Sequence, residues 1–445
     1  MNKFPALVFS FCIACGLQAF ASRLDEVVQY SVTGGKFMGS VLIVRADDIL
    51  LDKGYGFADI DRKTPNSPST KFCIGSLTKQ FTAACILLLE ERGKLHLGDP
   101  IKNYLSDIPT AWEKITFLEL LTHSSGIPDL TKFAEYNAAQ SVRVSPEELV
   151  AYFRDKPLDF PPGKNFRYSN SGYILLGCLI EKISGQNYAD FLRKNIFDPA
   201  GMHDSGYDFN SAPVEQEATG YKISPDGVVP AGYIDMTRAF SAGGLYSTTH
   251  DLLRWQQALY GGKILRSESL TRMTTPLNNS AGLGIGIFKF MGQKVYYHAG
   301  EIAGFNSQVS YFPETQTSVI VLSNLEGVGA SDIAPKLAKV AFGKSIVLPS
   351  ERPALSLPQE KLAKYVGTYE VSPGISVIIS LNKGQLFVEV PGRSPKEPIF
   401  PASEQDFFLR SEDAELKFLS DQKGEIISLT AKEPGEPVVK ATRKR

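Results

Sequence analysis

The sequence predicts an α/β (α+β) fold, in which an antiparallel sheet is flanked by helices and a largely helical subdomain is inserted, followed by a small all-β domain. Strand-like apolar runs lie near residues 41–51 and 294–322, and a helical stretch from residue 76 to about 260 separates them. That order is typical of a sheet assembled from both ends of a domain. After residue 358, short strand-like runs alternate with turn residues, which indicates a second, all-β unit.

The first 21 residues have the composition of a secretory signal peptide. Residues 1–3 include a lysine, residues 4–17 are apolar, and residues 19–21 form a small-x-small cleavage site. We therefore predict cleavage after Ala21 and export to the bacterial periplasm or the medium. Two alternatives stay open. One is an uncleaved membrane anchor, for which the apolar run is short, and the other is a lipoprotein anchored through Cys15.

The first strands are predicted to form a hairpin. Residues 41–44 and 49–51 are apolar, and the two aspartates at 47 and 48 favour a turn between them. A helix follows after a longer connection. Its apolar residues recur at helical spacing up to Leu89, and Gly93 favours a stop.

The start of that helix carries a nucleophile and a base at a useful spacing. Ser76 and Lys79 are three residues apart, so their side chains share one helix face with Cβ atoms roughly 5–6 Å apart. A lysine whose pKa is depressed by burial can remove the proton of a serine hydroxyl and make it a nucleophile. Taken alone, the Ser-x-x-Lys pattern is also compatible with an ordinary helix start.

Two further segments carry polar residues at the ends of predicted elements. Tyr168-Ser169-Asn170 follows a Pro-Pro-Gly turn and precedes an apolar helical run, which predicts a loop leading into a helix. His298-Ala299-Gly300 follows an aromatic run and is predicted to end a strand, with Glu301 directly after it. Asparagine and aromatic residues are also common beside such turns for structural reasons alone.

In this order, Ser-x-x-Lys, Tyr-x-Asn and His-x-Gly resemble the motifs of the serine β-lactamase and penicillin-binding-protein superfamily. The resemblance is to its class C-related branch of esterases, D-stereospecific peptidases and carboxypeptidases. Residues 121–126, which contain His123 as a residue expected to bond its own loop, and the glycine-rich segments 243–248 and 282–286 are similar to further landmarks of that family. The resemblance covers about residues 25–340 and implies an α/β sandwich with the active site at the seam between the sheet and the helical subdomain.

The resemblance implies a role for each motif. Ser76 is expected to form an acyl-enzyme that water hydrolyses. Lys79 and Tyr168 are expected to share the proton transfers, with the Lys79 ammonium able to stabilise a Tyr168 phenolate. Asn170 is expected to fix Lys79 and to touch the substrate. The backbone N–H groups of Ser76 and Glu301 are the expected oxyanion hole.

The third motif departs from that of lactam-processing relatives, which present a lysine and a threonine to a substrate carboxylate. Here His298, Gly300 and Glu301 are the expected substrate-binding residues. His298 is mostly neutral at its ordinary pKa, Ala299 lacks a hydroxyl, and Glu301 adds a negative charge. We therefore expect neutral or amine-bearing esters and amides to be preferred over penicillins and D-alanyl-D-alanine ends. Three arginines are alternative carboxylate anchors: Arg143, Arg167 and Arg238.

The expected function is thus an exported serine hydrolase that acts on esters, amides or peptides through Ser76. β-Lactamase or D-alanyl-D-alanine carboxypeptidase activity is the first alternative. A non-turnover penicillin-binding or sensor protein, in which Ser76 is acylated without release, is the alternative of another class. The expected partner is a small-molecule or peptide acyl substrate, and the sequence leaves the oligomeric state open.

Composition excludes other classes. A net charge of −1 over 445 residues, with 43% hydrophobic residues, is typical of a soluble globular protein and offers no basic surface for nucleic acid. The scattered histidines 96, 203 and 250 lack ligand spacing, so no metal and no cofactor are predicted. The pattern Gly282-x-Gly284-x-Gly286 lacks the setting of a nucleotide loop and is predicted to be a close-packed strand.

Three cysteines remain after signal cleavage: Cys73, Cys85 and Cys178. Their odd number implies at least one free thiol.

The length of the chain calls for two domains. We assign residues 22–345 to the hydrolase domain, 346–357 to a proline-bearing linker and 358–445 to the C-terminal domain. The C-terminal domain resembles the lipocalin-type barrel that follows the hydrolase domain in several relatives, and its expected role is stability or docking. The basic cluster around Arg443 is predicted to be a solvated tail.

Overall fold

The computed structural model of the chain describes residues 6–207, 214–224, 227–277, 281–327, 329–392, 394–433 and 437–444. It divides into two compact units. The first comprises Met1–Ile223 and Val228–Lys344, and the second comprises Ser224–Gly227 and Ser345–Arg445. Each unit is described by itself below. The predicted signal peptide falls on residues 1–5, which lie outside the described residues, and on the start of helix α1 (Ala6–Thr33).

The first unit is built on a six-stranded antiparallel sheet in the order β10-β11-β12-β13-β1-β2. The strands are β1 (Gly39–Arg45), β2 (Asp48–Tyr55), β10 (Gly286–Phe290), β11 (Gln293–Ile302), β12 (Phe305–Phe312) and β13 (Thr317–Ser323). β1 and β13 pair with Ile43 opposite Val319, so strands from both ends of the domain meet in the sheet. This confirms the predicted hairpin and the predicted sheet assembled from both ends.

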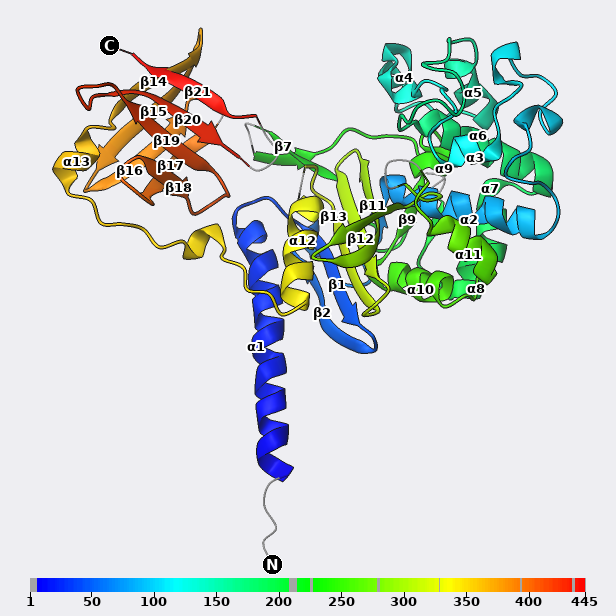
Figure 1. Cartoon of the computed structure of the whole chain (residues 1–445), viewed down its shortest axis with the longest axis horizontal. Coiled ribbons are helices and arrows are strands. Elements are labelled where there is room, and N and C mark those ends of the chain that lie inside the picture. The colour runs from blue at the N-terminus through cyan, green and yellow to red at the C-terminus, as the bar shows by residue number, and fades with distance from the viewer. Residues whose placement is uncertain are drawn as a thin grey trace, which may run out of the picture. The chain divides into compact units, whose positions relative to one another are not determined.

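Helices cover both faces of the sheet. Figure 1 shows α1 and α12 (Gly329–Ala341) on one side and the helical subdomain on the other. Residues 41–44 of β1 are at most 3% exposed, which explains why that strand is apolar without alternation. The C-terminal half of α1 has one buried apolar face, formed by Leu24, Val27 and Val28. Among the described residues, no helix combines the length and the apolar character needed to cross a bilayer.

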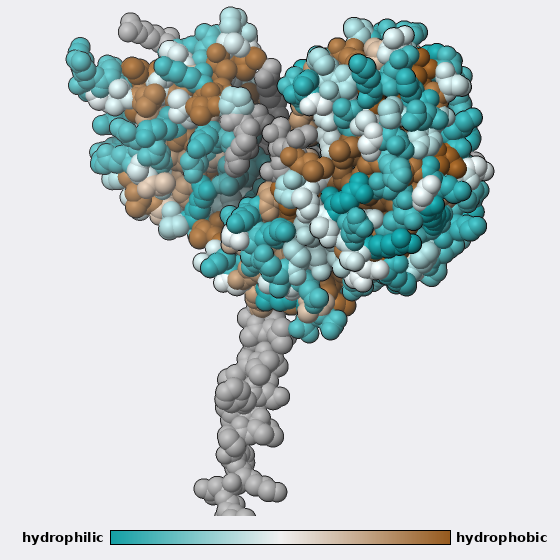
Figure 2. Space-filling model, turned by 45° about the vertical axis from the view of Figure 1, so that its right-hand side comes forward, coloured by the Kyte–Doolittle hydropathy of each residue, from teal (hydrophilic) through white to brown (hydrophobic). Residues whose placement is uncertain are grey.

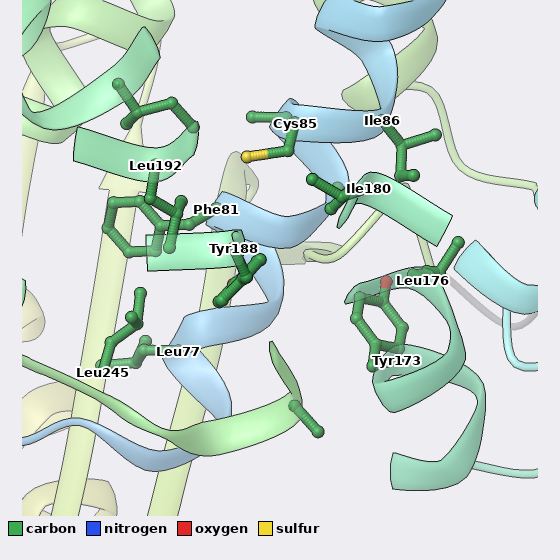
Figure 3. Packing of buried hydrophobic residues seen from close by; sticks show 14 of the residues in the cluster. Leu77, Phe81, Cys85, Ile86, Tyr173, Leu176, Ile180, Tyr188, Leu192 and Leu245 are labelled. Carbon is green, nitrogen blue, oxygen red and sulfur yellow. The ribbon is translucent and has the colours of Figure 1, made fainter. Parts of the chain in front are cut away.

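The helical subdomain is organised around two buried helices, α2 (Thr78–Glu91) and α6 (Asn170–Ser184). Figure 3 shows Leu77, Phe81 and Cys85 of the α2 segment pointing into a shared apolar cluster with side chains of α6 and the chain after it. Phe81 stacks on Trp255 with ring centroids 4.4 Å apart. The other helices of this unit are α3 (Phe117–Leu121), α4 (Ala134–Ala138), α5 (Pro146–Arg154), α7 (Tyr188–Leu192), α8 (Asp198–Ala200), α9 (Phe240–Gly243), α10 (Thr249–Tyr260) and α11 (Ser267–Met273).

Three local predictions are wrong. The stretch from 76 to 260 also contains short strands: β6 (Gly206–Tyr207), β7 (Tyr221–Ser224), β8 (Gly227–Pro230) and β9 (Leu245–Ser247), the first and last of which form a small sheet with β5 (Phe72–Cys73). The strand that carries His298 does not end there but runs to Ile302, because the turn comes only at Gly304, which has a φ of +78°.

The glycine pattern at 282–286 is a turn, and only Gly286 begins a strand. Gly284 has a φ of +72°, and a Cβ there would lie 2.6 Å from the Lys79 carbonyl oxygen. The glycines therefore allow this turn to pack directly on α2.

The second unit is a closed eight-stranded barrel in which neighbouring strands follow chain order. Its strands are β14 (Gly367–Ser372), β15 (Ile375–Asn382), β16 (Gln385–Val390), β17 (Ser394–Pro401), β18 (Asp406–Leu409), β19 (Glu415–Ser420), β20 (Ile426–Lys432) and β21 (Val439–Arg443), and the short helix α13 (Gln359–Ala363) precedes them. Buried side chains such as Tyr369, Phe407 and Phe418 pack together as its core. The all-β prediction is confirmed, and the lipocalin-type resemblance stays a prediction.

The expected solvated tail is wrong at Arg443. Its guanidinium donates to the carbonyl oxygens of Ile426 and Val366, and its strand pairs with β14 and β20. On the face shown in Figure 2, hydrophilic residues predominate and hydrophobic residues gather in small groups.

Candidate functional site

Ser76 lies in the 3₁₀ turn Gly75–Leu77, directly before α2, and Lys79 lies in the first turn of that helix. The Ser76 side chain is half-buried, and Lys79 has no exposed surface. Lys79 Nζ lies 2.9 Å from Ser76 Oγ. The predicted spacing thus brings the hydroxyl and the amine into direct contact.

Lys79 makes two further hydrogen bonds. Its Nζ donates to Asn170 Oδ1 at 2.8 Å and to the carbonyl oxygen of Ala242 at 2.7 Å. Ala242 belongs to α9 and Asn170 is the first residue of α6. The amine is therefore held by contacts with three separate segments of the chain.

Tyr168 lies on the loop before α6, as predicted, because Ser169 keeps an extended backbone with a φ of −143° before the helix begins. Tyr168 lines the same cleft as Ser76, and the Ser76 side chain acts to lower the pKa of the Tyr168 hydroxyl. The ring of Tyr168 is 4.8 Å from Lys79 Nζ. Its other neighbour is His123, whose imidazole stacks on it with ring centroids 4.4 Å apart.

Strand β11 supplies the opposite wall. A Cβ on Gly75 would lie 2.8 Å from the backbone nitrogen of Glu301, and a Cβ on Gly300 would lie 2.0 Å from the Ile74 carbonyl oxygen and 3.2 Å from the Ser76 nitrogen. Glycine at both positions is what lets the Ser76 turn approach the strand. The backbone of the Ser76 turn and the backbone around Glu301 are therefore closely packed.

The electrostatics of the site follow from burial. Burial lowers the pKa of Lys79 to about 7, against the opposing charge of Asp129. Burial and the Lys79 charge lower the pKa of His298 to about 4 and that of His123 to about 3, so both imidazoles are neutral at neutral pH. Burial raises the pKa of Tyr168. This shift runs against the expected stabilisation of a Tyr168 phenolate by Lys79, which stays a prediction.

A cleft opens over Ser76 in two parts. The wider part, about 560 Å³, is lined by Tyr168, His298 and the glycine turn after residue 281, and the narrower part, about 190 Å³, is lined by Asn170 and by residues near Tyr136. Ser76 and Glu301 line both. All seven residues predicted for the site (Ser76, Lys79, Tyr168, Asn170, His298, Gly300 and Glu301) thus lie at or beside this one cleft.

Comparison with known proteins decides the family. The beta-lactamase family model matches residues 24–342, and a domain family of unknown function matches residues 351–442. The chain belongs to the beta-lactamase family. It is a serine hydrolase of the superfamily that also contains the penicillin-binding proteins.

The relatives of this beta-lactamase-family protein cover most of its length. Penicillin-binding protein 4* of Bacillus subtilis is 30% identical over 413 residues, which are 86% of this chain and 90% of that protein. The octameric penicillin-binding protein homologue of Pyrococcus abyssi is 27% identical, with a TM-score of 0.68 over 95% of this chain and 99% of that one. The D-amino acid amidase of Ochrobactrum anthropi, complexed with D-phenylalanine, is 25% identical, with a TM-score of 0.64 over 72% and 99%.

In this beta-lactamase-family protein, Arg238 lines the narrower part of the cleft, and the other two candidate arginines line neither part. Arg238 is 1% exposed, and its guanidinium donates to the carbonyl oxygens of Val142 and Tyr136 and to the Tyr152 hydroxyl. Arg167 pairs with Asp159 at 2.8 Å. Arg143 lines a different cavity.

Sequence reasoning missed two contributors to the site. Asp129 is a buried carboxylate that accepts hydrogen bonds from Asn170. The ring of Tyr173 lies 5.6 Å from Lys79 Nζ. Their only sequence signal is position, since Asp129 closes the turn after the Ser-Ser-Gly segment and Tyr173 follows Asn170 by three residues. Within the described residues, no group of three or more potential metal ligands occurs.

Proposed function

We propose that this protein is an exported hydrolase that captures the acyl group of an ester or amide on Ser76, with esterase or D-peptidase activity favoured over β-lactamase activity. The observation that carries the proposal is the contact of Lys79 with Ser76, at 2.9 Å, inside a cleft to which the Tyr168 hydroxyl also contributes. Export rests on the signal-peptide prediction for residues 1–21. Mass spectrometry of the protein secreted by a bacterial host tests it, since cleavage predicts a chain that begins at Ser22.

Lys79 is suited to act as the base for the first step. Two of its three partners, Asn170 Oδ1 and the Ala242 carbonyl oxygen, accept hydrogen bonds and have no proton to donate. A neutral amine has two N–H bonds and one lone pair. With its N–H bonds directed at those two acceptors, the lone pair points to the Ser76 hydroxyl and can take its proton.

The oxyanion that forms when Ser76 attacks would be bound by the backbone N–H groups of Ser76 and Glu301. Such fixed donors supply several kcal/mol of transition-state stabilisation in a site that excludes water. The proton that Lys79 takes from Ser76 would then pass to the leaving group, with the Tyr168 hydroxyl giving up one proton as it receives another, so that Tyr168 stays neutral as its raised pKa favours. Water would then hydrolyse the acyl-enzyme.

The charges of the cleft favour neutral or amine-bearing substrates. His298 is neutral, Ala299 has no hydroxyl, and the exposed side chain of Glu301 borders both parts of the cleft. The cation that lines the narrower part, Arg238, is 1% exposed and already donates to three oxygens, whereas an ammonium group of the substrate would find the exposed Glu301 carboxylate. The similarity to a D-amino acid amidase supports an amide of an amino acid as one such substrate.

Two alternatives follow from the relatives. Similarity to penicillin-binding proteins favours β-lactamase or D-alanyl-D-alanine carboxypeptidase activity, or a protein that is acylated without turnover. Labelling with an alkyl fluorophosphonate followed by mass spectrometry tests the nucleophile. We expect the adduct on Ser76, and an identical adduct in Ser76→Ala would refute the assignment.

A substrate panel then separates the activities. We expect faster hydrolysis of a nitrophenyl ester and of a D-amino acid amide than of a chromogenic cephalosporin. Faster hydrolysis of the cephalosporin would favour a β-lactamase. A stable acyl adduct with no product release would favour the non-turnover alternative.

A further inference from the structure

Asp129 is a buried carboxylate that is linked to Lys79 through one intervening residue, Asn170. It is 7% exposed and begins the 3₁₀ turn Leu130–Lys132. Its oxygens accept from the Thr131 backbone N–H at 3.3 Å, from the Thr131 hydroxyl at 2.9 Å, from the Asn170 backbone N–H at 3.2 Å and from Asn170 Nδ2 at 3.3 Å. It does not contact Ser76 or the open cleft.

The contact with Asn170 fixes the orientation of that amide. A carboxylate only accepts hydrogen bonds, so Asn170 must present its NH₂ group to Asp129 and its oxygen to Lys79. A flipped amide would place an oxygen against the carboxylate and an NH₂ group against the amine. Asp129 therefore selects the one orientation in which Asn170 accepts from Lys79.

The charge of Asp129 also acts on Lys79. The titratable groups around the amine are Tyr168, Tyr173, His123, His298 and Asp129. Both tyrosines and both histidines are neutral near pH 7 because burial shifts their pKa values away from that range. Among these groups, Asp129 is thus the one that opposes the cost of a buried ammonium.

We propose that Asp129 is a positioning residue for the base. Through Asn170 it holds the Lys79 amine next to the Ser76 hydroxyl, and its charge sets the pH at which the amine can take the Ser76 proton. The inference rests on the proposed function, in which Lys79 activates Ser76. It adds a residue that never touches the substrate yet governs the pH range of acyl capture.

The chain offers a matched control. Asp235 is also buried, at 6% exposed, and closes the same Asp-x-Thr turn by accepting from the Thr237 backbone N–H at 3.0 Å and from its hydroxyl at 2.6 Å. Among the described residues, no hydrogen bond joins Asp235 to Asn170 or Lys79. Asp129→Asn and Asp235→Asn therefore remove the same charge from the same kind of turn, with and without the link to the base.

The test is the second-order rate of Ser76 labelling by an alkyl fluorophosphonate, measured from pH 5 to pH 9. We expect the midpoint of the rise in rate to move down by about one pH unit in Asp129→Asn, because the counter-charge of the ammonium is gone. The plateau should fall about tenfold, because Asn170 is free to flip. Asp235→Asn should keep the wild-type midpoint.

An Asp129→Asn rate that is lower at every pH with an unmoved midpoint would overturn the inference, since a structural defect alone has that effect. If Asp129→Asn melts far below the wild type, Asp129→Ser replaces it, because serine is smaller and its hydroxyl can close the same turn. The same downward shift is then required. A wild-type protein that is not labelled at Ser76 would instead refute the proposed function itself.

Discussion

The imidazole of His123 lies against the phenol of Tyr168, with ring centroids 4.4 Å apart and planes 30° from parallel. His123 Nδ1 also accepts a hydrogen bond from the backbone N–H of Ser169 at 3.2 Å. The same residue thus holds both the ring of Tyr168 and the backbone that follows it. His123 does so from a left-handed backbone conformation, with a φ of +54°.

His123→Asn should lower kcat about 10- to 100-fold with little change in melting temperature. Asparagine tolerates the left-handed backbone, but it cannot stack on Tyr168, and small misplacements of a catalytic group have effects of this size. Steady-state kinetics on an ester substrate measure the loss. His96→Asn, at an exposed position, is the control and should behave as the wild type. An unchanged kcat in His123→Asn would show that Tyr168 is held by other contacts.

Ser76→Ala should abolish turnover while leaving the melting temperature close to that of the wild type. The substitution removes one half-buried hydroxyl, and Lys79 keeps its bonds to Asn170 and the Ala242 carbonyl oxygen. Differential scanning fluorimetry and an ester assay on the same preparation check both expectations. Residual turnover well above that of an enzyme-free blank would mean that another nucleophile is present.

The kcat/KM of the protein should rise with pH through a midpoint near 7. The pKa of Lys79 is lowered from 10.5 to about 7, so the folded protein holds the amine protonated below that pH and neutral above it. Since the neutral amine is the base, activity should be lost as the pH falls through this value. A pH–rate profile measures it. A rate that is flat from pH 5 to pH 8 would contradict a role for Lys79 as the base.

Gly75→Ala should cost both stability and activity, whereas Gly93→Ala should cost stability alone. Both glycines have a positive φ, of +52° and +65°, so alanine is strained at each by about 1–2 kcal/mol. At Gly75 the added Cβ would lie 2.8 Å from the Glu301 backbone nitrogen, whereas nothing lies within 4 Å at Gly93. Pushing strand β11 away from Ser76 would disturb the two backbone donors.

Melting curves and ester kinetics on the two glycine variants separate these effects. We expect a loss of kcat of at least tenfold in Gly75→Ala and none in Gly93→Ala. Equal activity in the two variants would mean that the Glu301 N–H is not part of the oxyanion hole.

Glu301→Gln should reduce discrimination between substrates and leave the chemistry intact. The change removes the exposed carboxylate at the junction of the two parts of the cleft but keeps the backbone N–H. We expect kcat/KM for an amine-bearing amide to fall about tenfold relative to that for a neutral ester, as a charge-assisted contact is lost. Equal losses for the two substrates would place Glu301 away from the ammonium group.

The local parts of the site were predictable from sequence. Ser76 and Lys79 meet because they are one helical turn apart, and a turn followed by an apolar run places Tyr168 before α6. Asp129 was not predictable, because the chain contains an equivalent Asp-x-Thr turn at Asp235 and only tertiary contact distinguishes them.

The other features that the sequence did not indicate have the same origin. The direction in which the pKa of Tyr168 shifts depends on its burial in the packed cleft, which no local sequence pattern indicates. A basic C-terminal segment has the composition of a tail, and only its pairing with β14 and β20 makes Arg443 a structural residue. In the same way, the strand that carries His298 continues past it because β12 pairs with it as far as Ile302.

The pairing of β1 with β13 has a consequence for how the protein is made. Residues 39–45 and 317–323 are neighbours in the sheet although the entire helical subdomain separates them along the chain. Bringing such distant segments together slows folding, because the entropy of closing a long loop is lost before contacts compensate for it. Until β13 pairs with it, the apolar strand β1 has an unpaired edge, which is a surface prone to aggregation.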